Sequence, residues 1–556
     1  MKRLFLSAII FSVSALASMA CTSFIIGKKA SADGSVMVTY NADSYGSYYP
    51  FFFSPAAMHQ PGDMIEVYDR DTNEYRGKIA QVKETYNVTG YINEYQVSIG
   101  ETTYGGREEM VDTTGILDYG SLMLIALQRS KTAREAIDVM TSLVEKYGYC
   151  SEGESFSICD PNEAWIMEMQ GAGKNGVVWV AIRIPDDAIC AHANQSRITF
   201  FTQTKKLNKK KNRYETADCI YSANCIKYAR QQGWFEGKDA DFSWNAAYAA
   251  PDFSGRRFCD ARVWSFFRHF SDDFDKYLPW AEGIDKDAEP MPLWIIPNKK
   301  VSIQDVLAAN RDHYEGTPLA VSETLGGGIW EMPYQPTPLR FELDGKNYFT
   351  ERPISTQQTA FTFVSQLRSW LPRKVGGCFW YASDDGNMVA YTPIYCGNTE
   401  TPLCYDDPDA SDVKFSENSA FWMCNFVANM VYPRYSLIFP ELQEVRDSLE
   451  ASYFAQQADI EKKAAEMIEK GQEADAVDLL TSYSNKKAEE MMVCWKDLAT
   501  RIIVRYNDMT KKKMKDGKYV KTKDGLVVPV ERPGYPKNYA RRMIQQSKKS
   551  MQMPNN

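Results

Sequence analysis

A cysteine placed directly behind a secretory-type leader limits what the mature form of this chain can be. Residues 14–35 read SALASMACTSFIIGKKASADGS, and Cys21 is the residue after MA in that stretch. Residues 2–3 are basic, residues 4–17 are largely apolar, and Ser18 and Ala20 put small side chains at the positions that precede a cut. We therefore predict a signal peptide over residues 1–20 and a chain exported to the periplasm or outside a bacterium, beginning at Cys21.

Three roles for Cys21 are compatible with this junction: an incidental surface thiol, a lipid anchor and a nucleophile. A free N-terminal cysteine carries a thiol and an α-amine, and an amine of pKa about 7.7–8.0 can accept the proton of its own thiol. Only the thiolate attacks, and its ordinary pKa is about 8.5. A lipid-attachment signal calls for a branched apolar residue three positions before the cysteine, where this chain has Ser18. Acylation would also remove the amine as a base.

Composition argues against several classes of partner. A formal net charge of −8 disfavours binding to nucleic acid or to an anionic membrane surface. No stretch after the leader approaches the ~20 apolar residues of a membrane helix. Twelve cysteines in 556 residues are too dilute for a disulfide scaffold, although Cys219 with Cys225 and Cys396 with Cys404 are close enough in sequence to consider. The four histidines are scattered and form no HExxH motif, which argues against a metal site.

The pattern along the chain favours an α+β fold over a parallel doubly wound one. Residues 24–26 and 36–40 flank the turn SADGS and predict a hairpin, and apolar spacing predicts a helix over 119–147. The stretch TAFTFVSQLRSWLP, near residue 360, is predicted to be helical and to precede strands up to residue 400. Residues 439–508 predict a long helical hairpin with a break at Gly471, followed by a basic, turn-rich tail.

One glycine-rich segment imitates a cofactor motif. Residues 171–176 read GAGKNG and match GxGxxG. A dinucleotide-binding loop must open a helix, whereas a Val-, Trp- and Ile-rich strand follows here. We therefore predict that these glycines form a hairpin loop.

The residues after the leader resemble a known family. CTSFIIGKKASADGSVMVTYNADS, from Cys21 onward, resembles the start of the C69 dipeptidases, a branch of the N-terminal-nucleophile hydrolases related to bile-salt hydrolases and penicillin V acylases. Further blocks resemble that family in its own order: SIGETTYGGR, CDPNEAWIMEM, WVAIRIPDDAICAHANQSRI, ARVW, DVLAANRDHYEGT and GCFWYASDD. Together they cover most of residues 21–400.

The resemblance implies an αββα sandwich of two antiparallel sheets, with the N-terminus in a cleft between them. It implies a catalytic domain over residues 21–435 that hydrolyses amide bonds, chiefly in dipeptides, with no metal or organic cofactor. Residues 436–556 would be a helical hairpin and basic tail packed on that domain, with an architectural or assembly role that leaves room for a homo-oligomer.

Three site residues are carried over from the resemblance with defined roles. Cys21 matches the nucleophile. Asp43, in YNADS, matches the acid that holds the α-amine of the nucleophile. Asn194, in HANQSRI, matches the residue whose amide helps to form an oxyanion hole.

For four further positions the implied role is broader. Arg262, in ARVW, matches an arginine near the nucleophile that would position substrate or lower the pKa of the thiol, and a purely structural role is equally open. Thr102 and Thr103 lie where relatives place another contact on the oxyanion side, and the resemblance does not decide which of the two threonines matches that position. Tyr40 stands where relatives commonly carry arginine, which bears on substrate binding and on the thiol pKa. We expect His313 to be structural.

The predicted function is that of an exported cysteine amidohydrolase that cleaves dipeptides. Two alternatives stay open at this point. One keeps the fold and changes the substrate to an N-acyl amide, such as a conjugated bile acid or penicillin. The other is a lipid-anchored, non-catalytic protein that binds peptide or glycan.

Overall fold

Two antiparallel sheets form the centre of the molecule. The computed structural model describes residues 21–44, 46–173, 176–525, 527–547 and 551–553, so the predicted signal peptide lies outside the described residues. The first sheet has seven strands, in the order β18 (Trp294–Ile295), β14 (Ile189–His192), β1 (Ser23–Ile26), β2 (Val36–Asp43), β21 (Thr359–Leu367), β22 (Gly377–Ser383) and β23 (Thr392–Tyr395).

The second sheet has ten strands and pairs mostly sequence neighbours. Its order is β15 (Leu207–Asn208), β16 (Arg213–Glu215), β17 (Cys219–Ser222), β13 (Val177–Ile184), β12 (Ala164–Gly171), β11 (Gly153–Cys159), β10 (Ser98–Gly105), β9 (Ile92–Asn93), β8 (Val88–Thr89) and β3 (Phe53–Ser54). Almost every residue of β10 to β13 is buried, as expected for strands covered on both faces.

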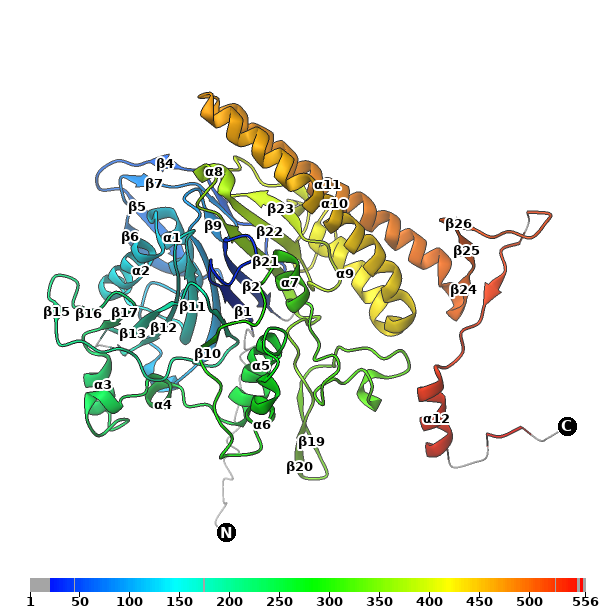
Figure 1. Cartoon of the computed structure of the whole chain (residues 1–556), viewed down its shortest axis with the longest axis horizontal. Helices are drawn as coiled ribbons and strands as arrows, with labels where there is room; N and C mark the ends of the chain where they lie inside the picture. The colour runs from blue at the N-terminus through cyan, green and yellow to red at the C-terminus, as the bar shows by residue number, and fades with distance from the viewer. Residues whose placement is uncertain (1–20, 45, 174–175, 526, 548–550, 554–556) are drawn as a thin grey trace, which may run out of the picture.

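The two sheets pack closely, face to face, where β1 and β2 meet β10 and β11. The hydroxyls of Ser23 and Ser157 lie 2.9 Å apart across this interface. A Cβ atom on Gly100 would lie 2.8 Å from the carbonyl oxygen of Thr39, so glycine is required there. Helices cover the outer faces of both sheets (Figure 1). Helices α1 (Tyr119–Arg129) and α2 (Ala133–Tyr147) cover the outer face of the ten-stranded sheet. The outer face of the seven-stranded sheet is covered by α9 (Ala420–Val431), α10 (Tyr435–Glu469) and α11 (Glu473–Arg505). The predicted αββα sandwich is confirmed.

The hairpin turns expected from the sequence are present. Asp33 Oδ1 accepts hydrogen bonds from the hydroxyl of Ser31 at 2.6 Å and from the main-chain N–H of Ser35 at 2.9 Å, and this closes the turn between β1 and β2. The GAGKNG segment joins β12 to β13, with the N–H of Ala172 donating to the carbonyl of Gly176 at 2.8 Å. All twelve cysteines lie among the described residues and are unpaired.

The helix expected over 119–147 is two helices. Ser130 has an extended backbone, and Asn93 donates to the carbonyls of both Leu127 and Ser130, so the chain leaves α1 there. Thr132 then starts α2 by accepting a hydrogen bond from the N–H of Glu135. The apolar periodicity continues across residues 130–132, but the N-cap at Thr132 divides the helical region into two helices.

The helix expected within TAFTFVSQLRSWLP is wrong, because residues 359–367 form strand β21. Every residue of β21 is buried between β2 and β22, and it pairs with both. Its Thr, Phe and Val side chains suit a strand, and pairing on two sides overrides the local helical periodicity.

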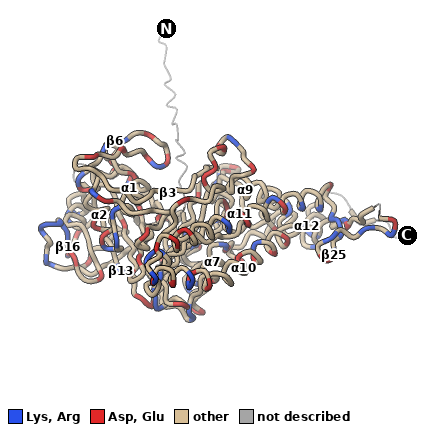
Figure 2. Tube along the Cα trace, turned by 90° about the horizontal axis from the view of Figure 1, so that it is seen from above, with Lys and Arg blue, Asp and Glu red and all other residues tan. Residues whose placement is uncertain are grey.

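The predicted C-terminal hairpin is confirmed. Helices α10 and α11 turn at Gly471, whose φ of +78° suits glycine, and they pack along β23 and α9. Seen from above, the segment with β25 (Met514–Lys515) and α12 (Lys537–Gln546) extends away from the sheets (Figure 2). The division of the chain at residue 435 stays a prediction. Within the described residues, no helix combines the length and the apolar composition needed to cross a bilayer.

A buried ion pair ties the hairpin to the sheet. Arg368, just after β21, makes two hydrogen bonds of 2.7 Å to Glu461 on α10, and Tyr395 on β23 donates to the same carboxylate at 3.0 Å. We expect Glu461→Ala to lower the free energy of unfolding by about 3–5 kcal/mol, because it leaves the buried Arg368 guanidinium without its counter-charge.

Denaturant unfolding of Glu461→Ala measures this effect. Glu466→Ala, at an exposed position of the same helix, is the matched control and should change stability by less than about 0.5 kcal/mol. Equal midpoints for the two variants would mean that the hairpin does not depend on this pair.

Candidate active site

The thiol of Cys21 lies at the interface between the two sheets. Cys21 lies two residues before the start of β1 and is fully buried. Its Sγ is 3.7 Å from the hydroxyl of Tyr40, on β2 of the same sheet, and 3.6 Å from Oε1 of Glu101, on β10 of the facing sheet. Tyr40 also donates a hydrogen bond to Glu101. The predicted position of Tyr40 beside the thiol is therefore observed.

The thiol is neutral in this environment. Burial raises the pKa of the Cys21 thiol well above its usual value, and the nearby carboxyls of Glu101 and Asp43 raise it further. Hydrogen bonds from the main chain of Asp43 and from Tyr40 act in the opposite direction. In the full-length chain the nitrogen of Cys21 is in a peptide bond, so it adds no basic group here.

Asp43 ends β2 beside Cys21 and is held from two sides. Its Oδ1 accepts from the hydroxyl of Thr359 at 2.6 Å, and its Oδ2 accepts from Nη2 of Arg352 at 2.5 Å. Burial raises the pKa of Asp43 to about 6, although Arg352 and Thr359 both favour the ionised form. The carboxylate is thus close to Cys21, as the sequence predicts, and its orientation is determined by its partners.

Arg262 connects Cys21 to the loop after β14. Its Nη1 donates to the carbonyl of Cys21 at 2.6 Å and to the hydroxyl of Thr22 at 2.7 Å. Its Nη2 donates to the carbonyl of Ala193 and to Oδ1 of Asn194, both at 2.9 Å. Arg262 is fully buried near the start of α5 (Ala261–Arg268), which follows a π-helical turn, a feature frequent at functional sites. These contacts favour a positioning role over a direct effect on the thiol.

Asn194 bridges the two sheets. Its Oδ1 accepts from Arg262, and its Nδ2 donates to the main-chain carbonyl of Thr103 on β10 at 2.6 Å. Asn194 has a φ of +63°, in the left-handed region that asparagine tolerates better than most residues. The side-chain amide therefore has a defined direction close to Cys21.

The predicted threonine pair divides between two networks. Thr102 shares a 2.7 Å hydrogen bond with Nδ1 of His192, whose pKa is lowered by burial to about 3. Thr103 donates from its hydroxyl to Oε1 of Glu154 at 2.6 Å, while its carbonyl contacts Asn194. Of the two, Thr103 is joined directly to a predicted oxyanion residue.

Sequence reasoning missed two charged residues of the site. Glu101 directly precedes the threonine pair in SIGETTYGGR, and a charged residue within an otherwise buried strand was the available signal. Arg352 lies in an irregular segment before β21 and reaches Asp43 only through the fold. His313, which we expected to be structural, is buried and pairs with Glu315 at 2.9 Å.

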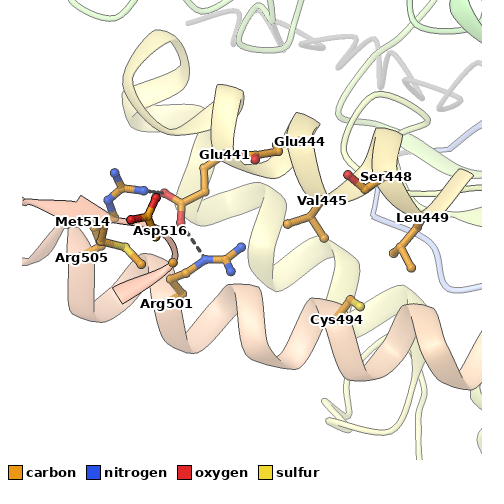
Figure 3. Close-up of a pocket in the computed structure, with 11 residues that line it drawn as sticks. Glu441, Glu444, Val445, Ser448, Leu449, Cys494, Arg501, Arg505, Met514 and Asp516 are labelled. Atoms are coloured by element: carbon orange, nitrogen blue, oxygen red, sulfur yellow. Dashed lines mark hydrogen bonds and ion pairs between the residues drawn. The ribbon is translucent and has the colours of Figure 1, made fainter. Parts of the chain in front are cut away.

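A surface pocket lies between α10, α11 and residues 514–517, and none of the site residues lines it (Figure 3). Three of its charged groups pair with one another, because Glu441 lies 2.7 Å from Arg501 and 2.6 Å from Arg505. This cluster connects the two helices of the hairpin.

Comparisons with known proteins point in one direction. The model of peptidase family C69 matches residues 20–448. The chain is 25% identical to a probable dipeptidase of Salmonella dublin, over 68% of this chain and 81% of that protein. It is 23% identical to a probable dipeptidase of Latilactobacillus sakei, over 88% of this chain and 96% of that protein. It is 24% identical to dipeptidase A of Lactobacillus helveticus, over 76% of this chain and 84% of that protein.

Proposed function

The chain belongs to peptidase family C69 and is a peptide-bond hydrolase, and from this premise we propose that it hydrolyses dipeptides with Cys21 as an N-terminal nucleophile. The observation that carries the proposal is the position of Asp43 beside the Cys21 thiol, together with Arg262, which contacts both the carbonyl of Cys21 and the side chain of Asn194. We also place the protein outside the cytoplasm, on the strength of the predicted signal peptide.

Removal of residues 1–20 would supply the missing base. The nitrogen of Cys21 then becomes an α-amine, whose ordinary pKa of about 7.7–8.0 lets it accept the thiol proton at neutral pH. Asp43 lies beside Cys21 and would stabilise the resulting ammonium. That ammonium also offsets the charge of Asp43, which helps to raise the thiol pKa in the full-length chain.

The reaction then runs in two halves. Sγ bonds to the scissile carbonyl carbon, and the amide of Asn194 donates to the oxygen on which negative charge develops. The intermediate collapses to a thioester as the amine of the second residue leaves with the proton held by the α-ammonium. Water, deprotonated by the same α-amine, hydrolyses the thioester and restores the thiol. Arg262 holds Cys21 and Asn194 in the same relative position during both halves of the reaction.

The test compares a chain that begins at Cys21 with one that retains the leader. We expect the processed chain to show an unmodified Cys-Thr-Ser N-terminus by intact mass and sequencing, and to hydrolyse dipeptides. The leader-bearing chain should be inactive on the same substrates, since its Cys21 nitrogen is an amide and cannot act as a base.

Two results would contradict the proposal. A diacylglyceryl-modified, N-acylated Cys21 in the native protein would favour the lipid-anchored binding protein, because the amine would be blocked. Cleavage of N-acyl amides with no cleavage of dipeptides would favour the alternative substrate class on the same fold.

A further inference from the structure

Two buried carboxyls beside the nucleophile have no function in the proposed reaction. Glu101 on β10 lies 3.6 Å from Sγ of Cys21, and neither its Oε2 nor the Oε2 of Glu154 accepts a hydrogen bond from a donor among the described residues. Glu154, on the neighbouring strand β11, lies within hydrogen-bonding reach of Glu101. Both side chains are fully buried. Burying two carboxyls with unsatisfied oxygens is energetically costly, and a bound ligand with hydrogen-bond donors would reduce that cost.

No cation of the described chain compensates this pair. Asp43 is paired with Arg352, whereas no ion pair in the described part of the chain includes Glu101 or Glu154. Burial raises the pKa of Glu101 to about 7 and that of Glu154 well above its usual value, which shows that a negative charge on this pair is disfavoured without a cation nearby. Asp71, a further neighbour, adds negative charge rather than positive. Tyr40 donates a hydrogen bond to Glu101 but brings no charge.

Resting on the proposed function, we propose that Glu101, backed by Glu154, binds the α-ammonium group of the substrate and thereby selects peptides with a free N-terminus. The α-nitrogen of an amino acid lies about 2.5 Å from its own carbonyl carbon. That carbon must come within about 3–3.5 Å of Sγ to react. An acceptor 3.6 Å from Sγ is therefore within reach of the α-nitrogen of the first residue, at an ammonium–carboxylate distance of about 2.8 Å.

The same pair disfavours an acyl group. An N-acyl amide presents carbon at the position where a dipeptide presents its ammonium, and it would leave two carboxyls buried without a cation. The cost is that of an unpaired buried polar group, which discriminates strongly between otherwise similar substrates. Selection of dipeptides over acyl amides would thus come from Glu101.

The experiment uses two substrates that differ in one group, alanyl-alanine and its des-amino analogue propionyl-alanine, with the mature chain. We expect the wild-type protein to prefer alanyl-alanine. Glu101→Gln should lower kcat/KM for alanyl-alanine by roughly 10- to 150-fold, the range for a hydrogen bond to a charged group, with a raised KM. It should change kcat/KM for propionyl-alanine by less than about threefold. Glu163→Gln, in the turn between β11 and β12 where Glu163 pairs with Arg134 at 2.8 Å, is the control and should alter neither.

Two outcomes overturn the inference. Equal losses on both substrates in Glu101→Gln would mean that Glu101 acts on the thiol instead of on the ammonium. A wild-type protein that cleaves both substrates equally well would mean that no ammonium receptor exists. Failure of the proposed function is distinguishable, since the wild-type protein would then leave alanyl-alanine uncleaved.

Folding of the variant is checked independently. Because the folded state raises the pKa of Glu101, it binds more protons than the unfolded state between about pH 4.5 and pH 7, and its stability falls as the pH rises through that window. Glutamine removes this loss, so Glu101→Gln should melt above the wild type at pH 8 and close to it at pH 4. If the glutamine variant does not fold, Glu101→Asp, which withdraws the carboxylate by one methylene, should weaken selection for the free N-terminus in the same direction, and unchanged selection would count against the receptor.

Discussion

Cys21→Ala in the mature chain should lower kcat for dipeptide hydrolysis by roughly 10⁴- to 10⁶-fold, because no other group can form the acyl-enzyme. Eleven further cysteines are present, and the structure shows them all as unpaired thiols, so loss of a thiol as such is not the cause. What distinguishes Cys21 is its position beside Asp43 and its contact through the main chain with Arg262.

Steady-state kinetics with matched variants measures this effect. Cys494→Ala, in the middle of α11 and only partly buried, is the control and should retain wild-type activity. Cys21→Ser keeps the α-amine and replaces the thiol by a weaker nucleophile, so the activity of this variant should lie between that of Cys21→Ala and that of the wild-type protein. Undiminished turnover in Cys21→Ala would remove the nucleophile from the proposal.

Arg262→Lys should lower kcat/KM by about 10²-fold or more, with the larger effect on kcat. The guanidinium donates to the carbonyls of Cys21 and Ala193, to the hydroxyl of Thr22 and to Oδ1 of Asn194, and a single ammonium cannot reproduce that planar set of contacts. Cys21 and Asn194, the proposed nucleophile and oxyanion donor, would then lose the side chain that holds both of them. A misplacement of about 1 Å is enough for a loss of that size.

Arg268→Lys provides the comparison for this variant. Arg268 lies on the same helix α5 and pairs with Asp312 at 3.1 Å, with no contact to Cys21 or Asn194. It should therefore keep kcat within a few-fold of wild type while testing the tolerance of the helix to the same change. Similar kinetics for Arg262→Lys and Arg268→Lys would refute the positioning role of Arg262.

The candidate site could be predicted in part because its motifs are local. Cys21, Asp43, Asn194 and Arg262 each lie in a short block with a recognisable residue order, and the structure brings all four together. The assignment of Thr102 and Thr103 remained open, because neighbouring residues on a strand point to opposite faces and only the pairing of β10 with β11 decides which network each joins.

Secondary structure was predicted well where the local signal was strong. The turn at Gly471 and the long helices on either side of it follow from composition and periodicity. Residues 359–367 were misread as a helix, because their strand conformation depends on pairing with β2 and β22. Strand β2 lies more than 300 residues earlier in the chain, so a short sequence window contains no sign of that pairing.

By itself, the sequence predicted an α+β fold and the order of its motifs, and the resemblance of those motifs to the C69 dipeptidases implied the antiparallel sandwich that the structure shows. The α+β pattern and the motif order rest on covalent order, turn chemistry and short-range periodicity, which can be read within a few residues. Only the tertiary structure decided the charges around Cys21: Arg352 lies against Asp43, and Glu101 lies beside Glu154 with no ion-pair partner among the described residues. The physical reason is that desolvation and Coulomb energies depend on distances across two packed sheets, and these distances are properties of the folded chain.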